Sequence, residues 1–175
     1  MNETKTGEPR KFATNSVQML RTVQSNTLAL SQMADQKASI LMGATFVVFS
    51  IAIGRALEGE MPWSLTVLAV FAFLSSLSAA WAVMPSILRP PQVPNGQQNP
   101  LFFGHFTFRD EEEWADEFLG RMQDEETMFR MMLRDLYQNG LVLQRRKYRY
   151  LTYAYRLFIA GMVLTLAVAA IEYTV

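Results

Sequence analysis

The sequence contains no cysteine and a single histidine, His105, and these shortages exclude several classes of chemistry. Without cysteine there is neither a disulfide framework nor a thiolate nucleophile. One histidine rules out metal sites that need several imidazole ligands, and it leaves most nucleophile–base pairs without their base. The Walker loop, the dinucleotide-binding fingerprint and the nucleophile elbow are also missing. We therefore expect a protein that is not an enzyme and that holds no cofactor or metal.

The chain also lacks net charge, because its 16 Lys and Arg residues balance its 16 Asp and Glu residues. Nucleic-acid binding depends largely on an excess of basic residues, so we expect no nucleic-acid partner. At the N-terminus no basic region leads at once into an apolar core, and we expect no signal peptide. What the chain has is hydrophobicity: hydrophobic residues make up 50% of it, and charge is nearly absent from three stretches.

These three uncharged stretches predict transmembrane helices. About 20 apolar residues cross the hydrocarbon core of a bilayer. The first and third stretches are short for this, but Arg55 and Arg156 lie near their ends and can extend their charged groups to the membrane surface. We therefore predict spans at 38–57, 62–84 and 150–173, with membrane lipids as the surroundings.

The polar segments before and between the spans show helical periodicity. Apolar residues recur at helical spacing from Val17 onward and again from Trp114 onward, which predicts two amphipathic helices that pack through their apolar stripes. Thr107 and Asp110 resemble a capping box at the start of the second helix. The remaining segments are an expected disordered tail and an irregular link. The expected order is 1–13 tail, 14–37 cytoplasmic helix, the first two spans, 85–107 cytoplasmic link, 108–149 cytoplasmic helical segment and the third span.

The distribution of basic residues predicts how the spans are oriented. Lys and Arg residues in short flanking segments favour the cytoplasmic side. Only Arg55 flanks one side of the predicted spans. The other side is flanked by Lys37, Arg89, Arg145, Arg146, Lys147 and Arg149. We therefore predict a cytoplasmic N-terminus and middle segment and an external C-terminus.

The basic cluster at 145–149 also suits anionic lipids, and recognition of a phosphate ligand is the alternative.

Asp35 and Lys37 mark the point where the first polar helix becomes apolar. Two residues apart on a helix, they do not face each other, so each is available to a different partner. We hypothesise that Asp35 pairs with a cation of the 145–149 cluster, and that Asp35, Lys37 and Arg149 form a two-state latch between the first and third spans. The sequence leaves open whether the first helix bends at Asp35 or continues.

Three groups of residues follow one another along the chain in a recognisable order. The groups are Ala34-Asp35-Gln36-Lys37-Ala38 followed by Leu41 and Gly43, then Asn99 to Phe106, then Asp135-Leu136-Tyr137 running to Leu143, Arg146-Lys147-Tyr148-Arg149 and Leu151. In this order they resemble the transmembrane effectors of bacterial Pycsar anti-phage systems, and the resemblance extends over roughly residues 20 to 171. It implies an all-α integral membrane protein of the bacterial inner membrane, paired functionally with a pyrimidine nucleotide cyclase.

In that family, infection by phage raises cyclic CMP or cyclic UMP, and the effector then damages the inner membrane. The resemblance therefore implies a cyclic pyrimidine mononucleotide as ligand and suggests a homo-oligomer. An anionic ligand needs cationic and aromatic partners, and our candidates are His105, Phe106, Arg146 and Lys147. The aromatic segment from Asn99 to Phe106 is either a packing plug or part of a pocket or gate. An ion channel-like pore and a membrane scaffold for a partner protein are the competing functions.

Overall fold

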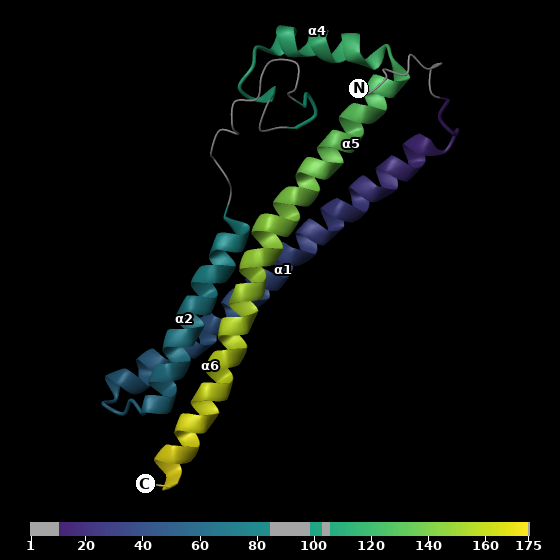
Figure 1. The fold of residues 1–175 in the computed structure, drawn as a ribbon. Coiled ribbons are helices and arrows are strands. Elements are labelled where there is room, and N and C mark those ends of the chain that lie inside the picture. Colours follow the sequence, from purple (N-terminus) through teal and green to yellow (C-terminus); the bar gives the residue numbers. More distant parts are fainter. Residues whose placement is uncertain (1–10, 85–98, 103–105, 175) are drawn as a thin grey trace, which may run out of the picture. The chain divides into compact units, whose positions relative to one another are not determined.

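The structure is a computed structural model that describes residues 11–84, 99–102 and 106–174. Its regular elements are all helices within these residues, and three of the helices are long and apolar enough to cross a membrane. This confirms the predicted all-α membrane fold (Figure 1). The chain divides into two compact units, unit 1 (Met1–Leu28 and Ile87–Gly140) and unit 2 (Ala29–Ser86 and Leu141–Val175).

Helix α1 (Ser16–Leu57) continues without interruption past Asp35, which resolves the question that the sequence left open. Its 42 residues make it far longer than the thickness of a bilayer core requires. The polar and apolar segments predicted at 14–37 and 38–57 are thus one helix. Gly59 follows it with a φ of 79°. Glycine adopts this left-handed conformation without steric penalty, which allows the tight turn before the next helix.

Unit 2 contains the larger part of α1, from Ala29 onward, together with helix α2 (Trp63–Val83) and helix α6 (Arg149–Thr174). Helices α2 and α6 pack side by side (Figure 1). Its core consists largely of alanine and leucine. Small side chains let helix backbones approach closely, which is the usual basis of helix association in a membrane. One buried cluster consists of Ala34, Ala38, Leu41, Ala79, Ala82, Leu143, Leu151 and Ala154.

Two contacts show how closely α2 and α6 approach. The hydroxyl of Ser75 is fully buried and donates a hydrogen bond of 2.8 Å to the carbonyl oxygen of Ala154. A Cβ atom added to Gly161 would overlap with Cβ of Phe71, so only glycine fits there without a backbone shift. Near the C-terminal end of α6, the carboxylate of Glu172 accepts hydrogen bonds from the backbone N–H groups of Trp63 and Ser64. It thereby supplies partners for N–H groups in the first turn of α2.

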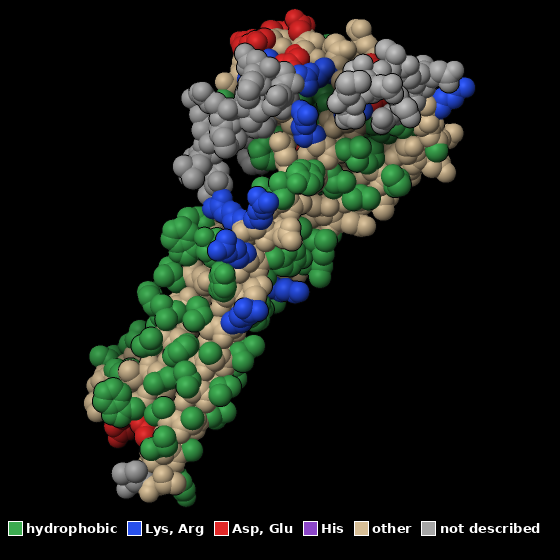
Figure 2. Space-filling model, viewed as in Figure 1, with side chains coloured by type: hydrophobic (Ala, Val, Ile, Leu, Met, Phe, Trp, Pro, Cys, Tyr) green, Lys and Arg blue, Asp and Glu red, His purple; other side chains and the backbone are tan. Residues whose placement is uncertain are grey.

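The outer faces of these helices expose large apolar side chains. Phe46, Ile51, Leu166 and Ile159 are all more than half exposed, although they lie in the most apolar parts of the chain. On the visible face of unit 2, Lys and Arg side chains gather in one band, and hydrophobic side chains dominate the surface beyond it (Figure 2). Apolar exposure of this extent suits lipid contact.

Unit 1 contains the start of α1, helix α4 (Glu111–Met122) and nearly all of helix α5 (Glu125–Val142). The sequence predicts one continuous helix from Phe108, whereas the structure has a break at Gln123. The predicted cap at Thr107 is also displaced. Asp110 caps α4 instead, because its carboxylate accepts hydrogen bonds from the N–H groups of Glu112 and Glu113 at 3.1 and 3.2 Å. Such bonds satisfy N–H groups that have no partner within the helix.

Candidate functional site

A π-helical turn, η1 (Leu143–Tyr148), lies between α5 and α6 and contains most of the basic cluster. π-helical turns are rare and frequently occur at functional sites. A wider turn changes the directions in which consecutive side chains leave the helix. In this turn the consecutive residues Arg146 and Lys147 contact two different elements of unit 2.

Lys147 forms an ion pair with Asp35 of α1. Its ammonium nitrogen lies 2.7 Å from Oδ2 of Asp35 and 2.8 Å from the hydroxyl oxygen of Ser31. The side chain of Lys147 is 21% exposed and that of Asp35 is 44% exposed. Oδ1 of Asp35 is buried, and it has no hydrogen-bond partner among the described residues. One carboxylate oxygen is therefore paired and the other is not.

Arg146 donates a hydrogen bond of 3.1 Å to the carbonyl oxygen of Met84, the residue that caps the C-terminal end of α2. A cation at this end complements the partial negative charge of the helix dipole. Together with the Lys147 pair, this contact joins η1 to both α1 and the end of α2. Three membrane helices of unit 2 are thus connected at one level of the bundle.

The structure has the predicted pairing between Asp35 and the basic cluster, but through a different cation. The sequence-based hypothesis assigns Arg149 to the latch and Lys147 to the ligand, whereas Lys147 contacts Asp35. The guanidinium carbon of Arg149 instead lies 5.9 Å from the centre of the Tyr153 ring. This is a cation–π arrangement. The Lys37 residue is exposed, and its carbonyl oxygen accepts a hydrogen bond of 3.4 Å from the hydroxyl of Tyr155.

In unit 1, the described part of the aromatic segment packs against α4. The rings of Phe106 and Trp114 have centroids 5.2 Å apart, and Phe118 continues the stack at 5.5 Å from Trp114. The indole N–H of Trp114 donates to the carbonyl oxygen of Pro100 at 2.9 Å. Buried Asn99 donates to the side-chain oxygen of Gln138 on α5 at 3.2 Å. These contacts hold the described part of the segment against α4 and α5, and whether the segment is a plug or part of a pocket stays a prediction.

A charge network fixes the start of α4 within unit 1. Arg109 forms ion pairs with Glu117 and, at 3.3 Å, with Glu113, and Arg121 also pairs with Glu117. Burial opposes ionisation of Glu117, but the hydrogen bond from Arg109 and the positive charges of both arginines outweigh it. The pKa of Glu117 is therefore lowered, and the pKa of Arg109 is raised mainly by its hydrogen bond to Glu117.

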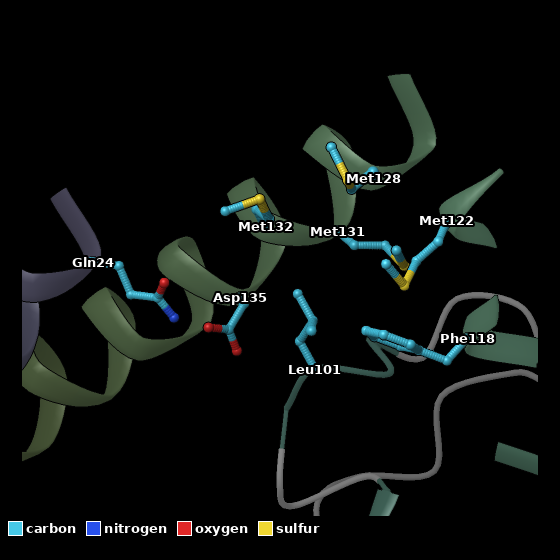
Figure 3. Close-up of a pocket in the computed structure, with 8 residues that line it drawn as sticks. All are labelled: Gln24, Leu101, Phe118, Met122, Met128, Met131, Met132 and Asp135. Carbon is cyan, nitrogen blue, oxygen red and sulfur yellow. The ribbon is translucent and has the colours of Figure 1, made fainter. Parts of the chain in front are cut away.

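A cavity of about 220 Å³ lies between the start of α1, the segment around Leu101, α4 and α5 in unit 1 (Figure 3). Asp135 is its buried charged group, and this burial raises the pKa of the Asp135 carboxyl despite a hydrogen bond from Asn139. Sequence reasoning missed the cavity, because the spacing of the methionines in α4 and α5 indicates only a packing stripe. The lining consists of Gln24, Leu101, Phe118, Met122, Met128, Met131, Met132 and Asp135.

The four residues predicted to bind the ligand do not belong to a single unit. His105 lies outside the described residues. Phe106 belongs to unit 1, whereas Arg146 and Lys147 belong to unit 2. The predicted ligand set therefore stays a prediction. The contacts that the structure shows for three of its members are those with Trp114, Met84 and Asp35.

Comparison with known proteins identifies the class to which these features belong. The family model described as the Pycsar effector protein domain matches residues 18–173, almost the whole chain. The chain belongs to this family. No curated protein and no solved structure matches it. Pycsar effectors act in anti-phage defence, and they are paired with a cyclase and its cyclic nucleotide signal. The chain is therefore a membrane protein of anti-phage defence.

Proposed function

We propose that this Pycsar effector acts in the bacterial inner membrane, where a cyclic pyrimidine nucleotide, cyclic CMP or cyclic UMP, activates it to impair membrane integrity. The observation that carries the proposal is the family match over a chain with three apolar helices. No catalytic step is required of the chain, because binding and rearrangement suffice. The pyrimidine nucleotide cyclase supplies the signal, and copies of the effector act together as a homo-oligomer that arrests the infected cell.

The ion pair between Asp35 and Lys147 suits the latch that such a switch needs. A partly desolvated pair resists separation, because breaking it leaves each charge without its partner. In this pair, the unpartnered Oδ1 of Asp35 is already buried, so the carboxylate is only half satisfied among the described residues. An arrangement of this kind is poised between two states, and a change in the packing of α1 against η1 shifts the balance.

The latch opens when Lys147 separates from Asp35 and Arg146 separates from Met84. Loss of the second contact frees the end of α2. A signal that binds more tightly to this open state therefore favours separation of the first and third spans.

The proposal is tested by expressing the effector in bacteria with a pyrimidine nucleotide cyclase under separate control. We expect growth to stop and propidium iodide to enter the cells only when both proteins are present. A catalytically inactive cyclase is the matched control. Normal growth and intact membranes in the presence of both proteins and measured cyclic CMP or cyclic UMP would overturn the proposal. Collapse of the membrane potential without dye entry would favour a narrow ion pore instead of general disruption.

A further inference from the structure

The cavity of unit 1 has the features of a small-molecule site. Ligand sites in proteins are mostly apolar and contain a few polar groups that fix the orientation of the ligand. Here four methionines, Leu101 and Phe118 form the apolar wall, and Gln24 and Asp135 supply the polar groups. Its volume is about 220 Å³. Typical ligand sites measure roughly 300 to 1,000 Å³. A single small ring therefore fits this cavity better than a whole nucleotide does.

Asp135 is the group that determines what the cavity accepts. Asp135 is only 7% exposed, and its Oδ2 atom accepts a hydrogen bond of 3.0 Å from the side-chain amide of Asn139. A carboxylate has acceptor capacity for more than one donor, and burial of a charge is unfavourable unless that capacity is used. The Asp135 carboxylate and the Gln24 amide lie on the same side of the cavity (Figure 3).

The walls favour a flat, polarisable ring. Thioether sulfur makes favourable contacts with aromatic rings, and flexible methionine side chains adapt to the outline of the ring. The carboxylate adds a requirement for an N–H donor on the ring's edge and repels a phosphate. A nucleobase that enters the cavity therefore leaves its phosphate outside.

We infer that the cavity takes the base of a cyclic pyrimidine nucleotide, with Asp135 accepting a hydrogen bond from the exocyclic amine of cytosine. This inference rests on the proposed function, because it names the site and the preferred base of the proposed signal. Carboxylates accept hydrogen bonds from the N4 amine of cytosine in nucleic-acid recognition. Uracil fits less well, since its only ring N–H on that edge stands between two carbonyl oxygens that the carboxylate repels.

The inference is tested by isothermal calorimetry of the full-length chain in detergent with cyclic CMP, cyclic UMP and cyclic AMP. We expect cyclic CMP to bind at least tenfold more tightly than the other two. Asp135→Asn keeps the side-chain shape and an acceptor for Asn139, but it removes the negative charge, so it should weaken cyclic CMP binding at least tenfold. The matched control is Asp116→Asn, at an exposed position of α4, and it should bind like the original chain.

A second pair of variants tests the cavity without changing charge. Met132→Trp fills the cavity and should abolish binding, whereas Leu133→Trp adds the same side chain at the adjacent exposed position and should not. If the original chain binds cyclic UMP best, or if both Asp135→Asn and Met132→Trp bind like the original chain, the inference fails and the proposed function stands. If the original chain binds no cyclic nucleotide, direct sensing fails, and with it the inference. Should Asp135→Asn not fold, the tryptophan pair decides.

Discussion

Among single residues, Asp35 and Asp135 carry the carboxylates with the most unusual surroundings. Asp35 has one oxygen paired with Lys147 and one buried oxygen without a partner among the described residues. Asp135 is buried and receives a hydrogen bond from Asn139, a neutral group. The carboxylate of Asp35 is thus incompletely compensated, and that of Asp135 is held in a buried place by a neutral partner. Departures of this kind from the best stability are expected where a group serves a switch or a ligand site.

The proposed latch, the ion pair between Asp35 and Lys147, predicts the behaviour of the Asp35→Asn variant. The variant keeps the side-chain shape but removes the charge that attracts Lys147, so we expect partial toxicity without the cyclase. Because solvent reaches nearly half of the Asp35 side chain, the pair is screened. We expect a shift of about 1 kcal/mol, or about fivefold in the balance between off and on states. Growth curves and dye entry measure this effect.

The charge-swapped double variant, Asp35→Lys with Lys147→Asp, serves as the control for the latch. It restores opposite charges at the two positions and should recover at least part of the quiet state. Toxicity of Asp35→Asn that equals that of the original chain, with and without the cyclase, would contradict the latch.

The raised pKa of Asp135 predicts how stability depends on pH. A carboxyl whose pKa is higher in the folded state binds its proton more tightly there, so its contribution to stability is present at low pH and is lost as pH rises through the folded-state pKa. Asp135→Asn removes the carboxyl group, and with it the loss of stability that occurs when this group ionises. Thermal unfolding should therefore show a higher Tm for the variant at pH 7, and the difference should disappear below the ordinary carboxyl pKa of about 3.9. A variant less stable than the original chain at pH 7 would contradict this account.

At the scale of elements, the contact between α2 and α6 depends on the absence of a side chain at Gly161. A methyl group there would meet Cβ of Phe71, which is attached to the backbone and cannot rotate away. We expect Gly161→Ala to destabilise the protein by about 1 to 3 kcal/mol, the usual effect of overpacking. Thermal unfolding in detergent measures it. Gly54→Ala is the control, because the space around Gly54 is open, and equal Tm values for the two variants would refute the close contact.

The helices that cross the membrane could be predicted from the sequence, because charge is nearly absent over about the length that a bilayer requires. The cap of α4, the break between α4 and α5 and the π-helical turn were harder to predict. Thr107 and Asp110 are both good caps, and residue type alone does not say which of them begins α4. The break at Gln123 leaves the apolar periodicity of the neighbouring helices intact, so the pattern does not reveal it. The π-helical turn η1 has no local signature that propensities or periodicity detect.

The candidate site could be predicted only in part for a similar reason. Asp35 lies just before the first apolar stretch, and the basic cluster at 145–149 lies just before the third. Both are therefore expected at the same depth in the membrane, which predicts that Asp35 contacts the cluster. The choice of Lys147 over Arg149 depends on the wider turn of η1, which the sequence does not show. The cavity at Asp135 depends on how the two helices of unit 1 meet, because the same methionines at the same spacing would serve equally well in a solid core.

At the scale of the whole molecule, the distribution of basic residues predicts a cytoplasmic N-terminus and an external C-terminus. The absence of cysteine makes this testable with single added thiols. In intact spheroplasts, a membrane-impermeant maleimide should label Thr174→Cys, and it should label Lys11→Cys only after permeabilisation. The reverse pattern would show that the orientation is inverted.

We propose that the chain itself converts a cyclic pyrimidine nucleotide into loss of membrane integrity. The most direct measurement uses the purified chain in liposomes that contain a self-quenched dye, with the cyclic nucleotide added on the side of the basic cluster. We predict dye release with cyclic CMP or cyclic UMP and none with cyclic AMP, and a weaker response to cyclic CMP in Asp135→Asn liposomes. Liposomes that retain their dye with every cyclic pyrimidine nucleotide, although the chain is inserted and folded, would contradict the claim.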